Sequence, residues 1–91
     1  MNEKIEEFFA RNSELSTEFS RYVLEHPNLD DQIPEDGVLI FLPEYDQELK
    51  EFNLKMAQEL RKEGGEVIYV KVKEMAPKVT SRLVGVDVGA P

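Results

Sequence analysis

The chain has 91 residues, a net charge of −8 and no cysteine, so it is long enough for one domain but small for a self-sufficient core. The lack of cysteine excludes disulfides, thiolate metal sites and cysteine nucleophiles, and it favours the reducing cytoplasm for a domain of this size. The acidic charge disfavours nucleic acids and anionic membranes as partners, and no apolar run approaches the roughly 20 residues of a membrane span.

The first predicted element is a helix over residues 3–25. Its apolar residues recur at spacings of three and four and form one stripe, made of Ile5, Phe8, Phe9, Leu15, Phe19, Tyr22 and Val23. Pro27 ends this helix, because the residue before a proline avoids helical geometry. Two polar residues, Asn12 and Ser16, fall on the stripe itself at about 100° per residue, so we expect them to lie away from solvent.

A connection and a central strand are predicted next. Leu29 and Ile33 stand four apart, which favours one short helical turn, and residues 34–37 form a turn rich in Pro and Gly signals. Residues 38–42 are five apolar residues in a row, and Pro43 follows them. Because this strand is apolar on both faces, we expect both faces to be covered.

A second helix is predicted over residues 45–63. Asp46 is its expected N-cap, and Gly64 supplies the left-handed stop. One apolar stripe runs along it, made of Tyr45, Leu49, Phe52, Met56 and Leu60. Asn53 flanks this stripe, and Leu54 points to the opposite side, where we expect solvent.

The second strand is predicted over residues 66–73, with side chains that alternate between two faces. One face holds Ile68, Val70 and Val72, and the other, wetter face holds Val67, Tyr69, Lys71 and Lys73. Residues 82–88 alternate weakly and could form a short third strand at the edge of the sheet.

A strand, a helix and a strand within about 35 residues predict a parallel βαβ unit with a right-handed crossover. With the N-terminal helix added, the fold class is α/β or α+β, in one small domain over residues 1–91. The spacing does not decide which face of the sheet the N-terminal helix covers. If both helices lie on one face, the bare face needs a second subunit, and the protein is then a dimer.

No pattern predicts a catalytic residue, a metal site or a cofactor. Glu44, Asp46 and Glu48 could hold a divalent cation, but carboxylates are common at the start of a helix without any metal. His26 is the only histidine, and its place at a helix C-terminus before Pro27 predicts a capping role. Because no nucleophile–base pair and no ligand set is visible, the sequence does not favour an enzyme.

Polar residues predict a network or a small pocket instead. Buried amide and hydroxyl groups need partners or cost roughly 1–3 kcal/mol each, so Asn12 and Ser16 require polar neighbours. The candidate members are Asn12, Ser16, Tyr22, Tyr45 and Asn53. For a contact with another chain, the candidate interface residues are Leu54 and Tyr69.

Several short motifs together resemble a known family. They are Asn12-Ser13-Glu14-Leu15-Ser16, Glu18-Phe19, Tyr22, His26-Pro27 and Leu42-Pro43-Glu44. Over nearly its whole length the chain is similar to a family of small uncharacterised prokaryotic proteins, classed as a domain of unknown function. The resemblance implies no catalytic or binding residues, and suggests only that the pattern over residues 12–27 belongs to the definition of the fold.

These patterns favour a protein that acts through protein contacts, as a homodimer, because the core is small and the central strand needs two covered faces. One alternative is an inhibitor or regulatory partner of another protein, for instance one with a basic surface, since residues 1–64 carry 7 Lys or Arg against 16 Asp or Glu. Another is a small-molecule-binding or weakly enzymatic domain with its pocket near Asn12, Ser16, Tyr45 and Asn53.

Overall fold

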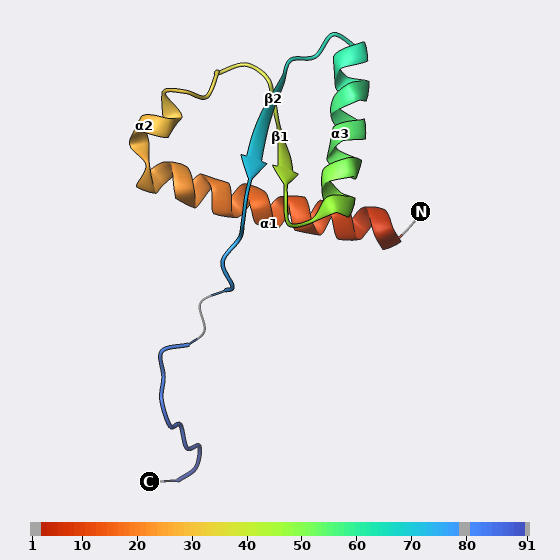
Figure 1. The fold of residues 1–91 in the computed structure, drawn as a ribbon. Coiled ribbons are helices and arrows are strands. Elements are labelled where there is room, and N and C mark those ends of the chain that lie inside the picture. The colour runs from red at the N-terminus through yellow and green to blue at the C-terminus, as the bar shows by residue number, and fades with distance from the viewer. Residues whose placement is uncertain (1–2, 79–80, 91) are drawn as a thin grey trace.

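The computed structural model describes residues 3–78 and 81–90, in which helices and strands follow one another along a small α+β domain (Figure 1). The elements are α1 (Glu3–Glu25), α2 (Pro27–Asp30), β1 (Val38–Pro43), α3 (Gln47–Lys62) and β2 (Val67–Val72). The predicted order of helix, strand, helix and strand is therefore confirmed, and the short helical turn expected after the first helix is α2.

The two strands form a parallel sheet, with α3 as the crossover between them. Phe41 of β1 lies opposite Val70 of β2, and Ile40 lies opposite Tyr69. Since paired residues in a sheet point to the same side, Phe41 and Val70 share one face, and Ile40 and Tyr69 share the other. This is the predicted βαβ unit.

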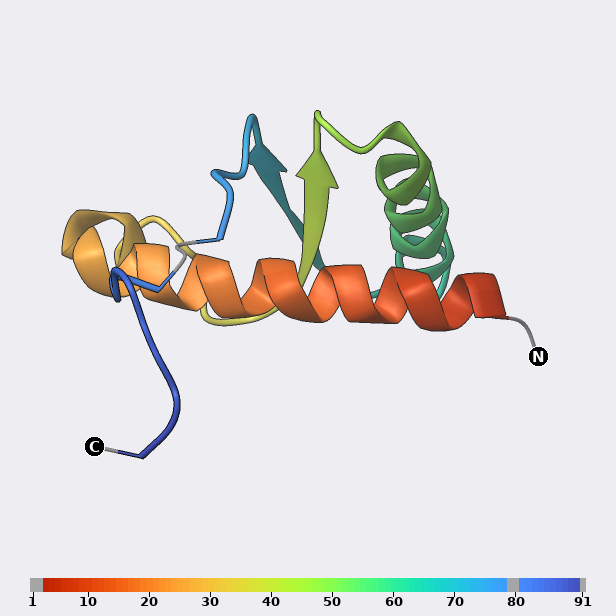
Figure 2. The ribbon, with the colours of Figure 1, turned by 90° about the horizontal axis from the view of Figure 1, so that it is seen from below.

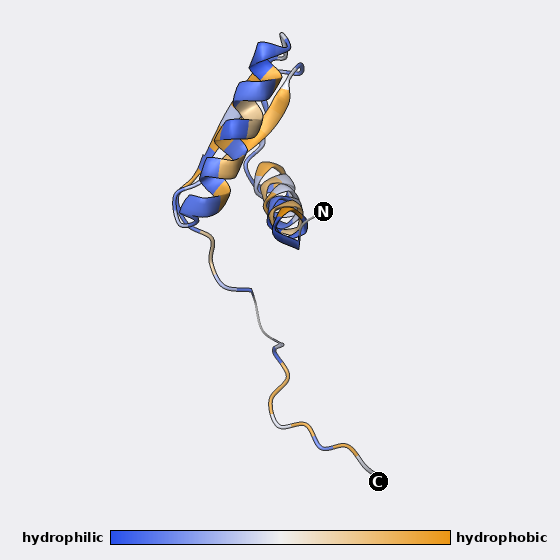
Figure 3. Ribbon diagram, turned by 90° about the vertical axis from the view of Figure 1, so that its right-hand side faces the viewer, coloured by the Kyte–Doolittle hydropathy of each residue, from blue (hydrophilic) through white to orange (hydrophobic). Residues whose placement is uncertain are grey.

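The N-terminal helix covers the face of the sheet that α3 leaves free. α1 runs across both strands (Figure 2), and Figure 3 shows it end-on beside the layer formed by α3 and the sheet. Its Phe8 and Leu15 form one buried cluster with Phe41, whereas Ile40 and Leu42 pack with α3 on the other face. Both faces of β1 are thus covered within one chain, which decides the question that the sequence left open.

Both ends of α3 follow from the expected local signals. The Asp46 carboxylate accepts a hydrogen bond from the backbone N–H of Leu49 at 3.1 Å, which is the geometry of an N-cap. At the other end Gly64 has φ +87°, and the N–H of Gly65 donates to the carbonyl of Leu60 at 2.9 Å. A glycine takes this positive φ without the steric cost of a Cβ, so the helix stops there.

The prediction that Leu54 points to solvent is wrong. Leu54 is half-buried and packs against the cluster of Ile40, Leu42 and Ala57. The buried line of α3 runs through Leu49, Asn53 and Ala57, each four residues apart. Apolar spacing alone predicts the wrong buried side of α3. The reason is that Asn53, at the centre of that side, is a polar residue whose burial depends on partners far away in the sequence.

The short edge strand allowed over residues 82–88 does not form. The chain leaves β2 past α1 and leads away from the sheet (Figure 1). Met75 is half-buried against the cluster on the α1 face, so the chain directly after β2 still packs on the core. Within the described residues the sheet therefore has two strands.

Candidate functional site

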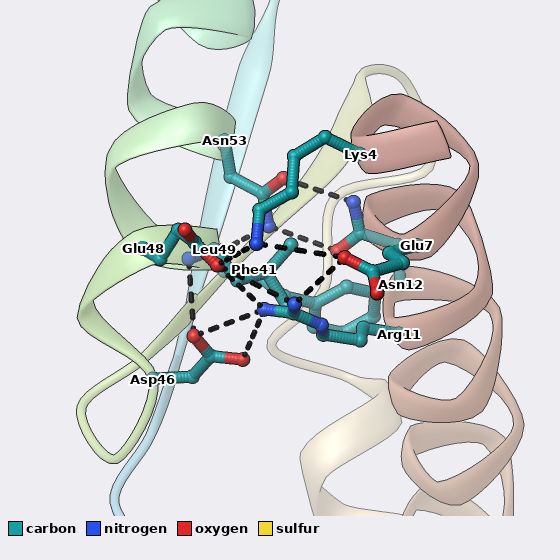
Figure 4. Close-up of polar contacts among 9 residues, drawn as sticks. All are labelled: Lys4, Glu7, Arg11, Asn12, Phe41, Asp46, Glu48, Leu49 and Asn53. Carbon is teal, nitrogen blue, oxygen red and sulfur yellow. Dashed lines mark hydrogen bonds and ion pairs between the residues drawn. The ribbon is translucent and has the colours of Figure 1, made fainter. Parts of the chain in front are cut away.

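Asn53 lies at the centre of the polar contacts that join three elements. Only 1% of its surface is exposed. Its Nδ2 donates to the Asn12 Oδ1 at 2.9 Å and to the Phe41 carbonyl at 2.8 Å, while its Oδ1 accepts from the Asn12 Nδ2 at 2.9 Å (Figure 4). The two amides thus bind each other reciprocally and tie α1 to α3.

The contact to Phe41 also completes one edge of the sheet. The N–H of Val38 donates to the carbonyl of Glu66, just before β2, and the N–H of Glu44 donates to that of Val72, so even-numbered residues of β1 face β2. In a parallel ladder the alternate residues face the opposite way, so the carbonyl of Phe41 points to the outer edge of β1. There the Asn53 amide donates to a carbonyl that a neighbouring strand would otherwise bind.

An ion-pair cluster lies beside the amide pair, at the crossing of α1 and α3 (Figure 4). Arg11 contacts Asp46 at 3.1 Å and Glu48 at 3.4 Å, and the Nζ of Lys4 lies 2.9 Å from the Glu48 carboxylate. The hydrogen bond from Lys4, with the nearby positive charges, holds the pKa of Glu48 below its ordinary value. The same contact raises the pKa of Lys4. These carboxylates are therefore paired with cations of the chain itself.

Aromatic contacts lie underneath this cluster. The rings of Phe8 and Phe52 stack with centroids 4.4 Å apart, and the guanidinium of Arg11 lies 5.2 Å from the centre of the Phe8 ring. The ring stack holds α1 on α3, whereas the cation–π contact lies within α1 and places Arg11 beside Phe8. Within the described residues, no group of three or more His, Asp or Glu is arranged to hold a metal ion.

A pocket of about 330 Å³ opens between α1, β1 and α3. Its lining is mostly apolar, formed by Phe9, Asn12, Ser13, Ser16, Leu39, Ile40, Phe41, Asn53 and Met56. Three of the predicted site residues, Asn12, Ser16 and Asn53, thus meet in one place. The two amides form their hydrogen bonds with each other and with Phe41. The pocket therefore offers a ligand mainly apolar surface, together with the hydroxyls of Ser13 and Ser16.

Ser16 and Tyr45 differ from what the sequence predicts. Ser16 lines the pocket but is exposed, against the expectation that it avoids solvent. Tyr45 is also exposed and does not line the pocket, and partial burial, followed by the charges of Asp46 and Glu14, raises the pKa of its hydroxyl. The structure therefore separates Tyr45 from the amide pair.

Tyr22 and His26 form a separate pair at the C-terminus of α1. Their rings stack with centroids 3.9 Å apart, and Tyr22 is exposed. The Nδ1 of His26 lies 2.8 Å from the carbonyl of Tyr22, so a proton on Nδ1 satisfies a carbonyl that the last turn of the helix leaves open. This is the capping role predicted for His26.

The outer edge of β2 remains open. Even-numbered residues of β2 face β1, so the N–H and C=O groups of Val67, Tyr69 and Lys71 point outward. Tyr69, an expected interface residue, is 38% exposed. Of the residues that the structure describes, none forms a third strand on this edge.

Sequence reasoning did not find the cations of the crossing, Lys4 and Arg11. Arg11 stands four residues after Glu7, a spacing that indicates a pair within one helix. The stronger partners, Asp46 and Glu48, are on α3, and no local spacing connects them to α1.

Comparisons with known proteins give one match. A family model described as "Family of unknown function (DUF5647)" matches residues 7–86, which confirms the resemblance to a domain of unknown function. A search of the curated proteins and a search of the solved structures each find no match. None of the described helices combines the length and the apolar character that crossing a membrane requires.

Proposed function

The chain belongs to this family of unknown function, and we propose from its geometry that it acts through protein contacts as a homodimer. The observation that carries this proposal is the open outer edge of β2. As part of the same proposal we expect the protein in the cytoplasm. A chain of this size without cysteine has no disulfide, so a reducing compartment does not weaken it.

An open edge is a template for another strand. The outward N–H and C=O groups of Val67, Tyr69 and Lys71 can form the same ladder with a second backbone that β2 forms with β1. A sheet of two strands is also marginal in stability, and added strands bury more apolar surface. Association at this edge therefore both satisfies these backbone groups and stabilises the sheet.

A second copy fits this edge because two-fold symmetry makes the same surface serve both partners. The earlier reasons for a dimer carry less weight, since α1 covers the free face of β1 and Leu54 packs inside the chain. The pocket supports a small-molecule function less well, because the amides of Asn12 and Asn53 already satisfy each other.

Light scattering after size-exclusion chromatography tests the homodimer. We expect twice the chain mass of 10.5 kDa at micromolar concentration. Lys71→Pro removes one outward N–H from the edge of β2 without removing a hydrogen bond to β1, so it should shift the protein to the monomer.

Lys71→Ala is the matched control, because it loses the same exposed side chain and keeps the N–H. It should remain dimeric. A wild-type protein that stays monomeric up to high concentration would rule out the homodimer.

A further inference from the structure

Residues 81–90 carry large apolar side chains that face solvent. The exposed fractions are 76% for Leu83, 93% for Val84, 64% for Val86 and 97% for Val88. Figures 1 and 3 both show this segment leading away from the helices and the sheet. A run of exposed apolar residues in a small protein marks a contact surface, so this segment needs a partner surface.

The spacing of these residues matches the open edge of β2. In an extended chain Val84, Val86 and Val88 point to one side, and Asp87 points to the other. Beside β2, the valines would continue its apolar face toward α1. Asp87 would then lie on the opposite, wetter face of the sheet.

We propose that residues 82–88 of a second copy pair with the outer edge of β2, and that the exchange is reciprocal. This inference rests on the proposed homodimer and identifies the segment that makes its contact. Each sheet gains a third strand, whose backbone satisfies the outward groups of Val67, Tyr69 and Lys71. Gly85 has φ +63° in the free segment, and because it has no Cβ it can change to the extended geometry that this strand requires.

The fold favours a second copy over the chain's own segment. About nine residues separate β2 from Arg82, which is long enough to reach the edge of the same β2. Met75, however, is half-buried against the cluster on the α1 face, and residues 81–90 lie away from the sheet (Figure 1). The segment therefore stays free for an edge on another molecule.

Charge supports contact through this part of the chain. Residues 1–70 carry 7 Lys or Arg against 17 Asp or Glu, whereas residues 71–91 carry 4 against 2. Two copies repel each other through their acidic parts, and residues 82–88, with Arg82 against Asp87, add no net negative charge to the contact. Charge therefore opposes contact through this segment less than contact through the acidic helices.

The first test compares two exposed apolar residues, each replaced by aspartate in the full chain. Val86→Asp places a charge on the apolar side of the exchanged strand, and we expect it to weaken dimerisation by about tenfold or more. Leu24→Asp makes the same chemical change at an exposed position of α1, and we expect less than about a twofold effect. Analytical ultracentrifugation over a concentration series gives both constants.

The second test mixes two variants that are each expected to be monomeric. Lys71→Pro has a blocked edge and an intact segment, whereas Val86→Asp has an intact edge and an impaired segment. Exchange between copies predicts a heterodimer in the mixture, held by one working contact. Native mass spectrometry detects it by mass at a concentration where neither variant forms a homodimer.

The outcomes separate this inference from the proposed function. If Val86→Asp dimerises like the wild type, the exchange is wrong and the homodimer stands on direct contact between β2 edges. If Val86→Asp is monomeric but the mixture gives no heterodimer, the segment acts within its own chain and the exchange is also wrong. A monomeric wild type overturns both proposals.

Discussion

Asn53 places a polar amide among the most buried positions of α3, and this is physically sound because three hydrogen bonds satisfy it. A buried amide without partners would cost roughly 1–3 kcal/mol, so its burial depends on Asn12 and Phe41 being in place. The pair therefore specifies how α1 and α3 meet, since an apolar contact at this crossing would tolerate other positions.

A double-mutant cycle on this pair should show strong coupling. We expect Asn53→Ala to lower the free energy of unfolding by about 2–4 kcal/mol, because it leaves Asn12 and the Phe41 carbonyl without their partner. Asn12→Ala should cost about 1–2 kcal/mol. Urea unfolding of both single variants and the double variant gives the coupling, expected at about 0.5–3 kcal/mol. Additive effects would contradict the pairing.

The charges of Lys4 and Glu48 should make stability depend on pH at both extremes. The pKa of Glu48 is lowered in the folded chain, so its contribution is present at neutral pH and disappears as the pH falls through that value. The pKa of Lys4 is raised, so its contribution is lost only when the pH rises through that raised value, in the alkaline range.

We expect Glu48→Gln to reduce the stability difference between pH 7 and pH 3, measured by urea unfolding at low salt. Both side chains are solvent-exposed, so 1 M salt should reduce the same difference in the wild type. Glu51→Gln, at an exposed position of α3 outside this cluster, is the control and should leave the pH difference nearly unchanged. An equal effect of both substitutions would show that net charge alone is responsible.

At the scale of elements, the sequence located the helices and strands because their signals are local. Asp46, Pro27 and Gly64 act on their own neighbours, so helix ends follow from residues within one turn. The side of α3 that faces the sheet was harder to predict, because it includes Asn53. A pattern built from apolar residues leaves an amide out. Asn53 thus has two roles: it belongs to the buried side of α3, and it joins α3 to α1.

Asp46 serves both α3 and the crossing, and two substitutions separate these roles. Asp46→Ala should lower the free energy of unfolding by about 1–2 kcal/mol, because the N–H of Leu49 loses its acceptor. Asp46→Asn keeps an acceptor for Leu49 and loses the charge that pairs with Arg11. We therefore expect Asn to restore more than half of the loss in thermal or urea unfolding. Equal losses would assign the stabilisation to the ion pair instead of the cap.

At the scale of the whole molecule, α1 completes the coverage of both faces of β1 within one chain. The outer edge of β2 stays open. The coverage of the faces lets the chain bury the strand without a partner. The open edge and the apolar segment at residues 81–90 are the features from which we propose association.

If the homodimer forms, stability should depend on protein concentration. We expect the wild-type Tm to rise over a hundredfold increase in concentration, because association stabilises the folded state by mass action. Lys71→Pro should have a Tm that does not change over this range, while Lys71→Ala should follow the wild type. Differential scanning calorimetry measures all three, and a wild-type Tm independent of concentration would contradict association.

The sequence by itself determined the order of elements, the parallel βαβ unit, the helix caps and the two faces of β2, because each depends on neighbours in the chain or on strand alternation. It identified Asn12 and Ser16 as polar residues in need of partners, and Asn53 as a candidate member of their network. Only the tertiary structure decided that Asn12 and Asn53 bind each other, that Arg11 meets Asp46, and that Tyr45 stands apart.

The tertiary structure also decided that residues 82–88 form no strand in the sheet of their own chain. These results depend on where α1 crosses the sheet. The crossing is fixed by packing and hydrogen bonds between residues about 35–41 positions apart, which no local pattern contains.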